Sequence, residues 1–106
     1  MLSEQIIVTT TPTSIRQLIA TARSTDLASI PRDCTGIQVR YESGETAIVT
    51  LTDADHGSGS NTGAVILDAA NQSLLSASFE QYEIQNTLLN CNTGTVVVHI
   101  VITRTL

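Results

Sequence analysis

The final segment of the chain, Gly94 to Leu106, constrains the fold most, because it has the pattern of a strand with apolar side chains on both faces. Successive side chains of a strand point to opposite faces. One face therefore carries only aliphatic residues, namely Val96, Val98, Ile100 and Ile102, and the other carries Thr95, Val97, His99, Val101 and Thr103. The protein's own core can cover the first face, so we expect the second face to meet a second sheet or another subunit.

Composition limits the chain to one small domain with an aliphatic core. With 106 residues, a single domain buries roughly two thirds of the surface that its unfolded chain exposes. Hydrophobic residues make up 42% of the chain, yet there is one Phe, two Tyr and no Trp, so Val, Ile, Leu and Ala must fill the core. Cores rich in β-branched side chains favour sheets.

The charge pattern argues against nucleic-acid partners, and the hydropathy pattern argues against a membrane. The formal net charge is −5, Lys is absent, and the five Arg are scattered along the chain, whereas nucleic-acid binding needs a clustered basic patch. The first residues lack the basic and apolar segments of a signal peptide, and no stretch reaches the roughly 18 apolar residues of a transmembrane helix. We therefore expect synthesis in a cytoplasm. In that reducing compartment Cys34 and Cys91 are expected to be buried thiols, with a disulfide as the alternative.

Local patterns near the N-terminus predict a strand followed by one short helix. Gln5 to Thr10 has the pattern of a strand, and we assign residues 1–12 to an N-terminal strand or arm that Pro12 ends. Ser14 with Gln17 three residues later is a capping box. An apolar stripe at helical spacing accompanies it, which predicts a helix over 14–23 formed around Ile15, Leu18, Ile19 and Ala22.

The rest of the chain is predicted to be β structure. Residues 37–41 and 46–52 both alternate and flank a turn at 42–45, which predicts a hairpin. Further strands are expected at 64–68, 78–84 and 87–91, before the final segment. About seven or eight short strands at regular spacing indicate a jelly-roll-like antiparallel β-sandwich, and residues 13–106 are expected to form it as a single domain.

The best candidate for a metal site is the segment from Asp53 to His56, which precedes a loop rich in Gly and Ser that runs to Gly63. Two acidic residues before glycines resemble the start of an EF-hand loop, but Ala64 stands where the bidentate Glu is required. A solvated acidic turn is therefore the better interpretation. We expect no metal and no other cofactor.

Catalytic interpretations are weaker than structural ones at each candidate residue. His99 lies in the middle of the final strand, and catalysis would require a nucleophile and an orienting carboxylate beside it. A histidine packed at an interface or in the core is the simpler interpretation. Glu80 and Glu83 are three positions apart in a predicted strand, so they point to opposite faces and cannot act as a pair. We expect a protein that is not an enzyme.

The order of these patterns over nearly the whole chain resembles the capsid cement or decoration proteins of tailed phages. The segments that carry the resemblance are Thr11-Pro-Thr-Ser-Ile-Arg-Gln-Leu-Ile19, Gly36-Ile-Gln-Val-Arg-Tyr41, Val49-Thr-Leu-Thr-Asp53, Phe79-Glu-Gln-Tyr-Glu-Ile84 and Gly94-Thr-Val-Val-Val-His-Ile100. The resemblance implies a β-sandwich on the outer surface of an icosahedral capsid, where it binds the major capsid protein and ties neighbouring capsomers together.

A protein with this role needs a rigid body and a face for self-association. We expect a homo-oligomer, a trimer, in which Val97, His99 and Val101 line the contact between subunits. The N-terminal arm can add a strand to the sheet edge of a neighbour. We therefore expect a second group of residues to contact a neighbouring subunit or the capsid, namely Ile6, Ile7 and Val8.

Two alternatives remain open at this point. The same patterns would suit a phage head-to-tail connector, or a tail or fibre component. A small jelly roll of the cupin type, with ligand-binding or enzymatic function, is the alternative from a different class. Its metal site would need several His and a Glu converging inside one barrel, and the chain has only His56 and His99.

Overall fold

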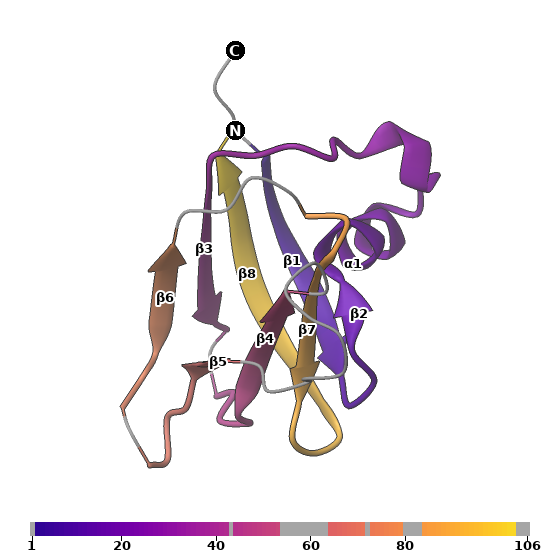
Figure 1. Cartoon of the computed structure of the whole chain (residues 1–106). Helices are drawn as coiled ribbons and strands as arrows, with labels where there is room; N and C mark the ends of the chain where they lie inside the picture. The colour runs from indigo at the N-terminus through magenta and orange to yellow at the C-terminus, as the bar shows by residue number, and fades with distance from the viewer. Residues whose placement is uncertain (1, 43, 54–63, 72, 80–83, 104–106) are drawn as a thin grey trace.

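The computed structural model describes residues 2–42, 44–53, 64–71, 73–79 and 84–103, which form two antiparallel sheets and one α-helix (Figure 1). Sheet A contains β1 (Leu2–Thr9), β8 (Thr95–Thr103), β3 (Gly36–Tyr41) and β6 (Ser76–Phe79), in that order. Sheet B contains β2 (Thr13–Ser14), β7 (Thr87–Cys91), β4 (Val49–Asp53) and β5 (Ala64–Leu67), in that order. The helix α1 spans Ile15–Arg23, and a 3₁₀ turn, η1, spans Leu27–Ser29.

The pairing of the strands is that of a jelly roll. The first strand pairs with the last, β2 pairs with β7, β3 with β6, and β4 with β5, all antiparallel. This is the arrangement of one long antiparallel ribbon folded at its middle and rolled so that its halves form two sheets. The predicted β-sandwich with one short helix is therefore confirmed.

The final strand divides its two faces as its sequence predicts. Val96, Val98, Ile100 and Ile102 are each at most 1% exposed, while the alternate residues are partly or largely exposed. The buried side chains join one core with residues of sheet B, among them Val49, Leu67 and Leu89. Sheet B therefore covers the inner face of β8 and leaves its other face on the outside of the sandwich.

Helix α1 begins where the capping pattern predicts. Ser14 is the N-cap, and its hydroxyl oxygen accepts a hydrogen bond from the backbone N–H of Gln17 at 3.0 Å. The Gln17 side chain donates to Thr21 instead of turning back to Ser14. The buried stripe contains Ala20 rather than the predicted Ala22, because the helix lies against β1 and sheet B and buries Ile15, Leu18, Ile19 and Ala20.

The predicted hairpin between residues 37–41 and 46–52 is wrong. β3 pairs with β8 and β6 in sheet A, and β4 pairs with β7 and β5 in sheet B, so the chain crosses from one layer to the other after Tyr41. The Tyr41 hydroxyl donates to the carbonyl of Ala47 within this crossing. Alternation in a sequence shows which side chains share a face, but it does not show which strand is the neighbour.

The N-terminal segment is a strand of the sandwich itself. β1 pairs with β8 from Leu2 to Thr9, so the segment predicted as a strand or arm lies at the edge of sheet A, beside α1.

Cys34 and Cys91 are both buried and form no disulfide. Within the described ranges, no helix has the length and apolar character needed to cross a membrane. The loop from His56 to Gly63 and the pair Glu80 and Glu83 lie outside the described residues.

Candidate functional site on the outer face of sheet A

The outer face of sheet A, which points away from sheet B, carries the candidate functional residues. Cross-strand pairing arranges its side chains in rows. One row runs from Gln5 through His99 and Arg40 to Ser76, and the next runs from Ser3 through Val101 and Gln38 to Ser78. His99 is thus near the centre of the face.

The ring of His99 lies between two polar groups from distant parts of the chain. Its Nε2 is 2.7 Å from the Ser3 hydroxyl oxygen, and its Nδ1 is 3.6 Å from Oε1 of Glu42. The side chains of His99 and Glu42 are 26% and 32% exposed. When the ring is protonated, it therefore forms an ion pair with Glu42 that is partly screened by solvent.

A hydroxyl, an imidazole and a carboxylate in this order also occur in hydrolase triads. The Nδ1 to Oε1 distance of 3.6 Å is too long for the hydrogen bond that would orient the ring. Sequence reasoning missed Ser3 and Glu42 as neighbours of His99 because only the strand register brings them together. The two contacts hold the ring between β1 and the segment after β3.

An apolar groove lies on one side of His99, along β1 and the helix. Ile7 is 58% exposed and stands directly opposite Val97. The two side chains border a groove of about 440 Å³, whose other lining residues are Gln5, Leu18, Thr21 and Ala22. Of the large exposed aliphatic side chains in the described part of the chain, which are Ile7, Val65 and Leu75, Ile7 is the one that borders this groove.

The segment after β3 makes hydrogen bonds with the backbone of Val97. The backbone N–H of Val97 donates to Oε2 of Glu45 at 3.0 Å, and its carbonyl accepts from the N–H of Glu42 at 3.2 Å. Both backbone groups of Val97 are therefore satisfied within the chain. Its side chain is left as the group that can contact a partner.

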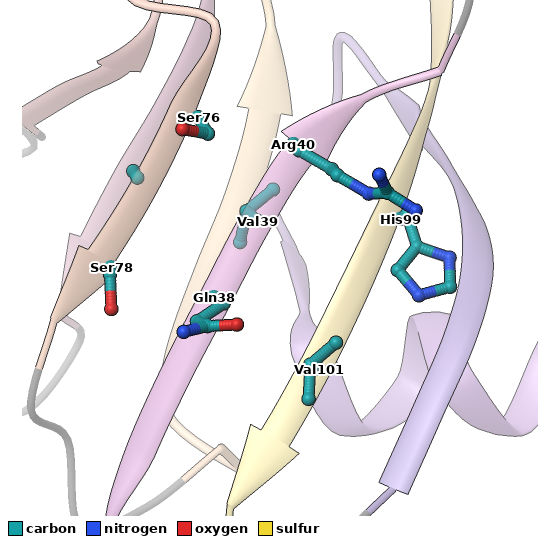
Figure 2. A pocket seen from close by; sticks show the side chains of 8 residues that line it. Gln38, Val39, Arg40, Ser76, Ser78, His99 and Val101 are labelled. Carbon is teal, nitrogen blue, oxygen red and sulfur yellow. The ribbon is translucent and has the colours of Figure 1, made fainter.

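A polar groove of about 560 Å³ lies on the opposite side of His99, over β3, β6 and β8. Figure 2 shows the Arg40 side chain extending from β3 toward the ring of His99, with Gln38 beside it on the same strand. Ser76 and Ser78 line the groove from β6, and Val101 lines it from β8. The outer face thus carries mainly aliphatic side chains toward the helix and mainly polar side chains toward β6.

The predicted contact residues divide between these surfaces and the core. Val97 borders the apolar groove, whereas His99 and Val101 border the polar one. Ile6 and Val8 are fully buried in the chain's own core, so they face no neighbour, while Ile7 is exposed. Contact between the N-terminal segment and a neighbour stays a prediction. Of the three residues, Ile7 is the one exposed for such a contact.

Among the residues that the structure describes, no three His, Cys, Asp or Glu side chains gather as metal ligands. Asp55 and His56, from the predicted acidic turn, are outside those residues. Comparison of the chain with protein-family models, with curated proteins and with solved structures finds no match.

Proposed function

We propose that this chain is a structural protein of a virus particle, an oligomeric cement or decoration protein that binds and stabilises the assembled capsid of a tailed phage from outside. The jelly roll supports the proposal by analogy, because this fold recurs in viral capsid proteins, although it also serves lectins and cupins. The exposed apolar pair of Ile7 and Val97 on one outer face of the sandwich supports a surface for self-association. The partners in this proposal are other copies of the chain and the major capsid protein.

The observation that carries the proposal is the cross-strand pair of Ile7 and Val97. Ile7, on the edge strand of sheet A, is 58% exposed and leaves apolar surface in water. Burying the exposed part of one such side chain stabilises a contact by about 1 kcal/mol. The adjoining groove beside α1 extends this apolar surface, as expected of a patch that another subunit covers.

The proposed mechanism is mass action. A protein that binds the assembled capsid lattice and not its separated subunits stabilises the lattice in proportion to the logarithm of its excess over the dissociation constant. An oligomer presents several copies of the same weak contact at once, so its total affinity exceeds that of each contact. Neither step requires chemistry from the chain.

Multi-angle light scattering on the wild-type chain and on Val97→Asp tests the proposal. We expect a discrete wild-type oligomer, a trimer, and a monomeric variant with an unchanged circular dichroism spectrum, because the charge would be buried against apolar surface. Thr95→Asp is the matched control, since Thr95 is exposed on the same strand outside the groove. A monomeric wild type, or an oligomer that Val97→Asp leaves intact, would contradict the proposed surface. Co-sedimentation of the oligomer with capsids of the virus that encodes it then tests the partner.

The two alternatives give different outcomes in the same measurements. A closed ring of higher order than a trimer would favour a head-to-tail connector. A cupin-like site requires ligands inside the barrel, whereas His99 is on the outer face of sheet A. The position of His99 therefore does not support the cupin alternative.

A further inference from the structure

The outer face of sheet A has a second groove besides the apolar groove that Ile7 and Val97 border. We propose that this polar groove, bordered by Gln38, Arg40, Ser76, Ser78, His99 and Val101, binds a carboxylate flanked by hydroxyl groups, as in a sugar acid. The inference does not rest on the proposed function. The groove and the Ile7–Val97 pair lie on opposite sides of His99.

Arg40 is the group that would bind the carboxylate. Arg16 donates to the carbonyl of Ile30 and to Gln85, and Arg23 pairs with Glu4 at 2.7 Å. The Arg40 side chain, by contrast, makes no hydrogen bond or ion pair with another of the described residues. Its guanidinium lies near the ring of His99 (Figure 2). A planar guanidinium matches the two oxygens of a carboxylate and can donate to both.

The lining around Arg40 suits hydroxyl groups. Arg40 stands opposite Ser76 and Gln38 opposite Ser78, so three neutral polar side chains line the same groove as Arg40. Each of the three can donate and accept hydrogen bonds, as a sugar hydroxyl can. Neighbouring strands are about 4.8 Å apart and alternate residues about 7 Å apart, so these groups span the width of one sugar ring.

The size and the apolar part of the groove agree with a small ligand. Its volume of about 560 Å³ lies within the range of roughly 300 to 1,000 Å³ that is common for small-molecule sites. Val101 stands opposite Gln38 and supplies an aliphatic surface for the C–H groups of a sugar ring. Ser3 and Glu42 contact the nitrogens of His99, so the ring is held as a fixed wall of the groove.

The charge of the chain restricts which acids can bind. The net charge is −5, and the carboxylate of Glu42 lies beside His99, so the surrounding potential opposes a polyanion. A ligand with one carboxylate experiences less repulsion and gains the same contact with Arg40. The expected ligand is therefore a single acidic sugar unit, free or at the end of a saccharide, rather than a densely charged polymer.

Amide NMR titrations of the isotope-labelled chain with D-glucuronate, D-glucose and acetate test the proposal. Glucuronate should shift the resonances of Gln38, Arg40, Ser76 and Ser78 saturably, and it should bind at least about tenfold more tightly than either glucose or acetate. A glucuronide disaccharide that ends in the acid should bind at least as well, because only the terminal unit enters the groove. The same titration on Val97→Asp shows the site in the monomer, if the subunits of the oligomer cover it.

Variants separate a specific site from weak binding elsewhere. Arg40→Gln should lower the affinity for glucuronate about tenfold or more, and Arg40→Lys should restore only part of it, because Lys lacks the planar fork. Arg32→Gln is the matched control, since Arg32 is exposed and lies outside the groove. The proposal is overturned if glucuronate gives no saturable shifts in either the oligomer or the monomer, if acetate binds equally well, or if Arg32→Gln weakens binding as much as Arg40→Gln.

Discussion

His99 and Ser3 are 96 positions apart in the sequence, and Nε2 of the one lies 2.7 Å from the hydroxyl oxygen of the other. This contact joins the first and last strands on the outer face of sheet A, beside the pairing of Ser3 with Val101 and of Gln5 with His99. The position of the His99 ring therefore depends on the N-terminal strand. Any function of the face depends on both ends of the described chain.

Ser3→Ala should destabilise the fold by no more than about 1 kcal/mol, because a single partly exposed hydrogen bond contributes about that much. Urea unfolding followed by circular dichroism measures the change. Ser78→Ala is the control, since Ser78 is exposed on the same face but lies on β6. A loss of several kcal/mol in Ser3→Ala would show that the contact with His99 has a larger role than its exposure implies.

Substitutions on the two faces of β8 should lower the free energy of unfolding by unequal amounts. Ile100→Ala removes a side chain that is 0% exposed, and we expect it to lower the free energy of unfolding by about 2–5 kcal/mol. Val101→Ala, one position later on the outer face, should cost less than about 1 kcal/mol in the monomer. Denaturant unfolding of both variants in the monomeric Val97→Asp background checks this, and equal costs would contradict the assignment of the two faces.

The hydrogen bond between the Ser14 side chain and the N–H of Gln17 should stabilise the fold. Ser14→Ala removes the side-chain acceptor for the N–H of Gln17 and should destabilise the protein by about 1 kcal/mol. Gln17→Ala should change the stability by less than about 0.5 kcal/mol, because Gln17 is exposed and its side chain contacts Thr21 rather than the cap. Thermal or urea unfolding distinguishes the two, and a larger effect of Gln17→Ala would indicate a complete capping box in solution.

Stability should fall at alkaline pH through Cys34. Burial, followed by the charge of Asp33, raises the pKa of the Cys34 thiol above its ordinary value of 9.0. Well below pH 9.0 the thiol is protonated in both states, so its contribution to stability is fully present. Above that value the unfolded thiol ionises while the folded one keeps its proton, and stability is lost as the pH rises through the folded pKa.

The comparison of wild type with Cys34→Ala isolates this effect. The variant should lose less stability than wild type when the pH rises from 9.0 toward 10.0. Burial and the charge of Asp68 raise the pKa of Tyr41 above its ordinary value of 10.0, although a hydrogen bond with the backbone of Ala69 opposes the shift, so its contribution begins at higher pH and is shared by both proteins. Parallel stability curves for the two proteins would refute the role of Cys34.

The parts of the fold that depend on local pattern could be predicted from the sequence. The strand Thr87–Cys91 has the predicted bounds, and the faces of β8 follow directly from alternation. The helix follows from Ser14 and the stripe after it. These features succeed because each one depends on residues only a few positions apart.

The parts that depend on pairing between distant strands could not be predicted. Alternation on both sides of the turn at 42–45 suggested a hairpin, but the choice between sheets depends on contacts with β7 and β8, later in the sequence. For the same reason, the sequence did not indicate that Ser3 and Glu42 lie beside His99. The polar groove also arises only when β6 is placed beside β3, which no local pattern indicates.

The position of β8 also has a consequence for synthesis. It follows the other seven strands of the described residues in the sequence, yet it lies between β1 and β3 in sheet A. During translation, sheet A therefore stays open at its middle until β8 has left the ribosome, with the edges of β1 and β3 unpaired. Completion of the core is then a late event governed by long-range pairing, and such folding is slow. A ribosome that stalls before β8 emerges would leave a nascent chain prone to aggregation.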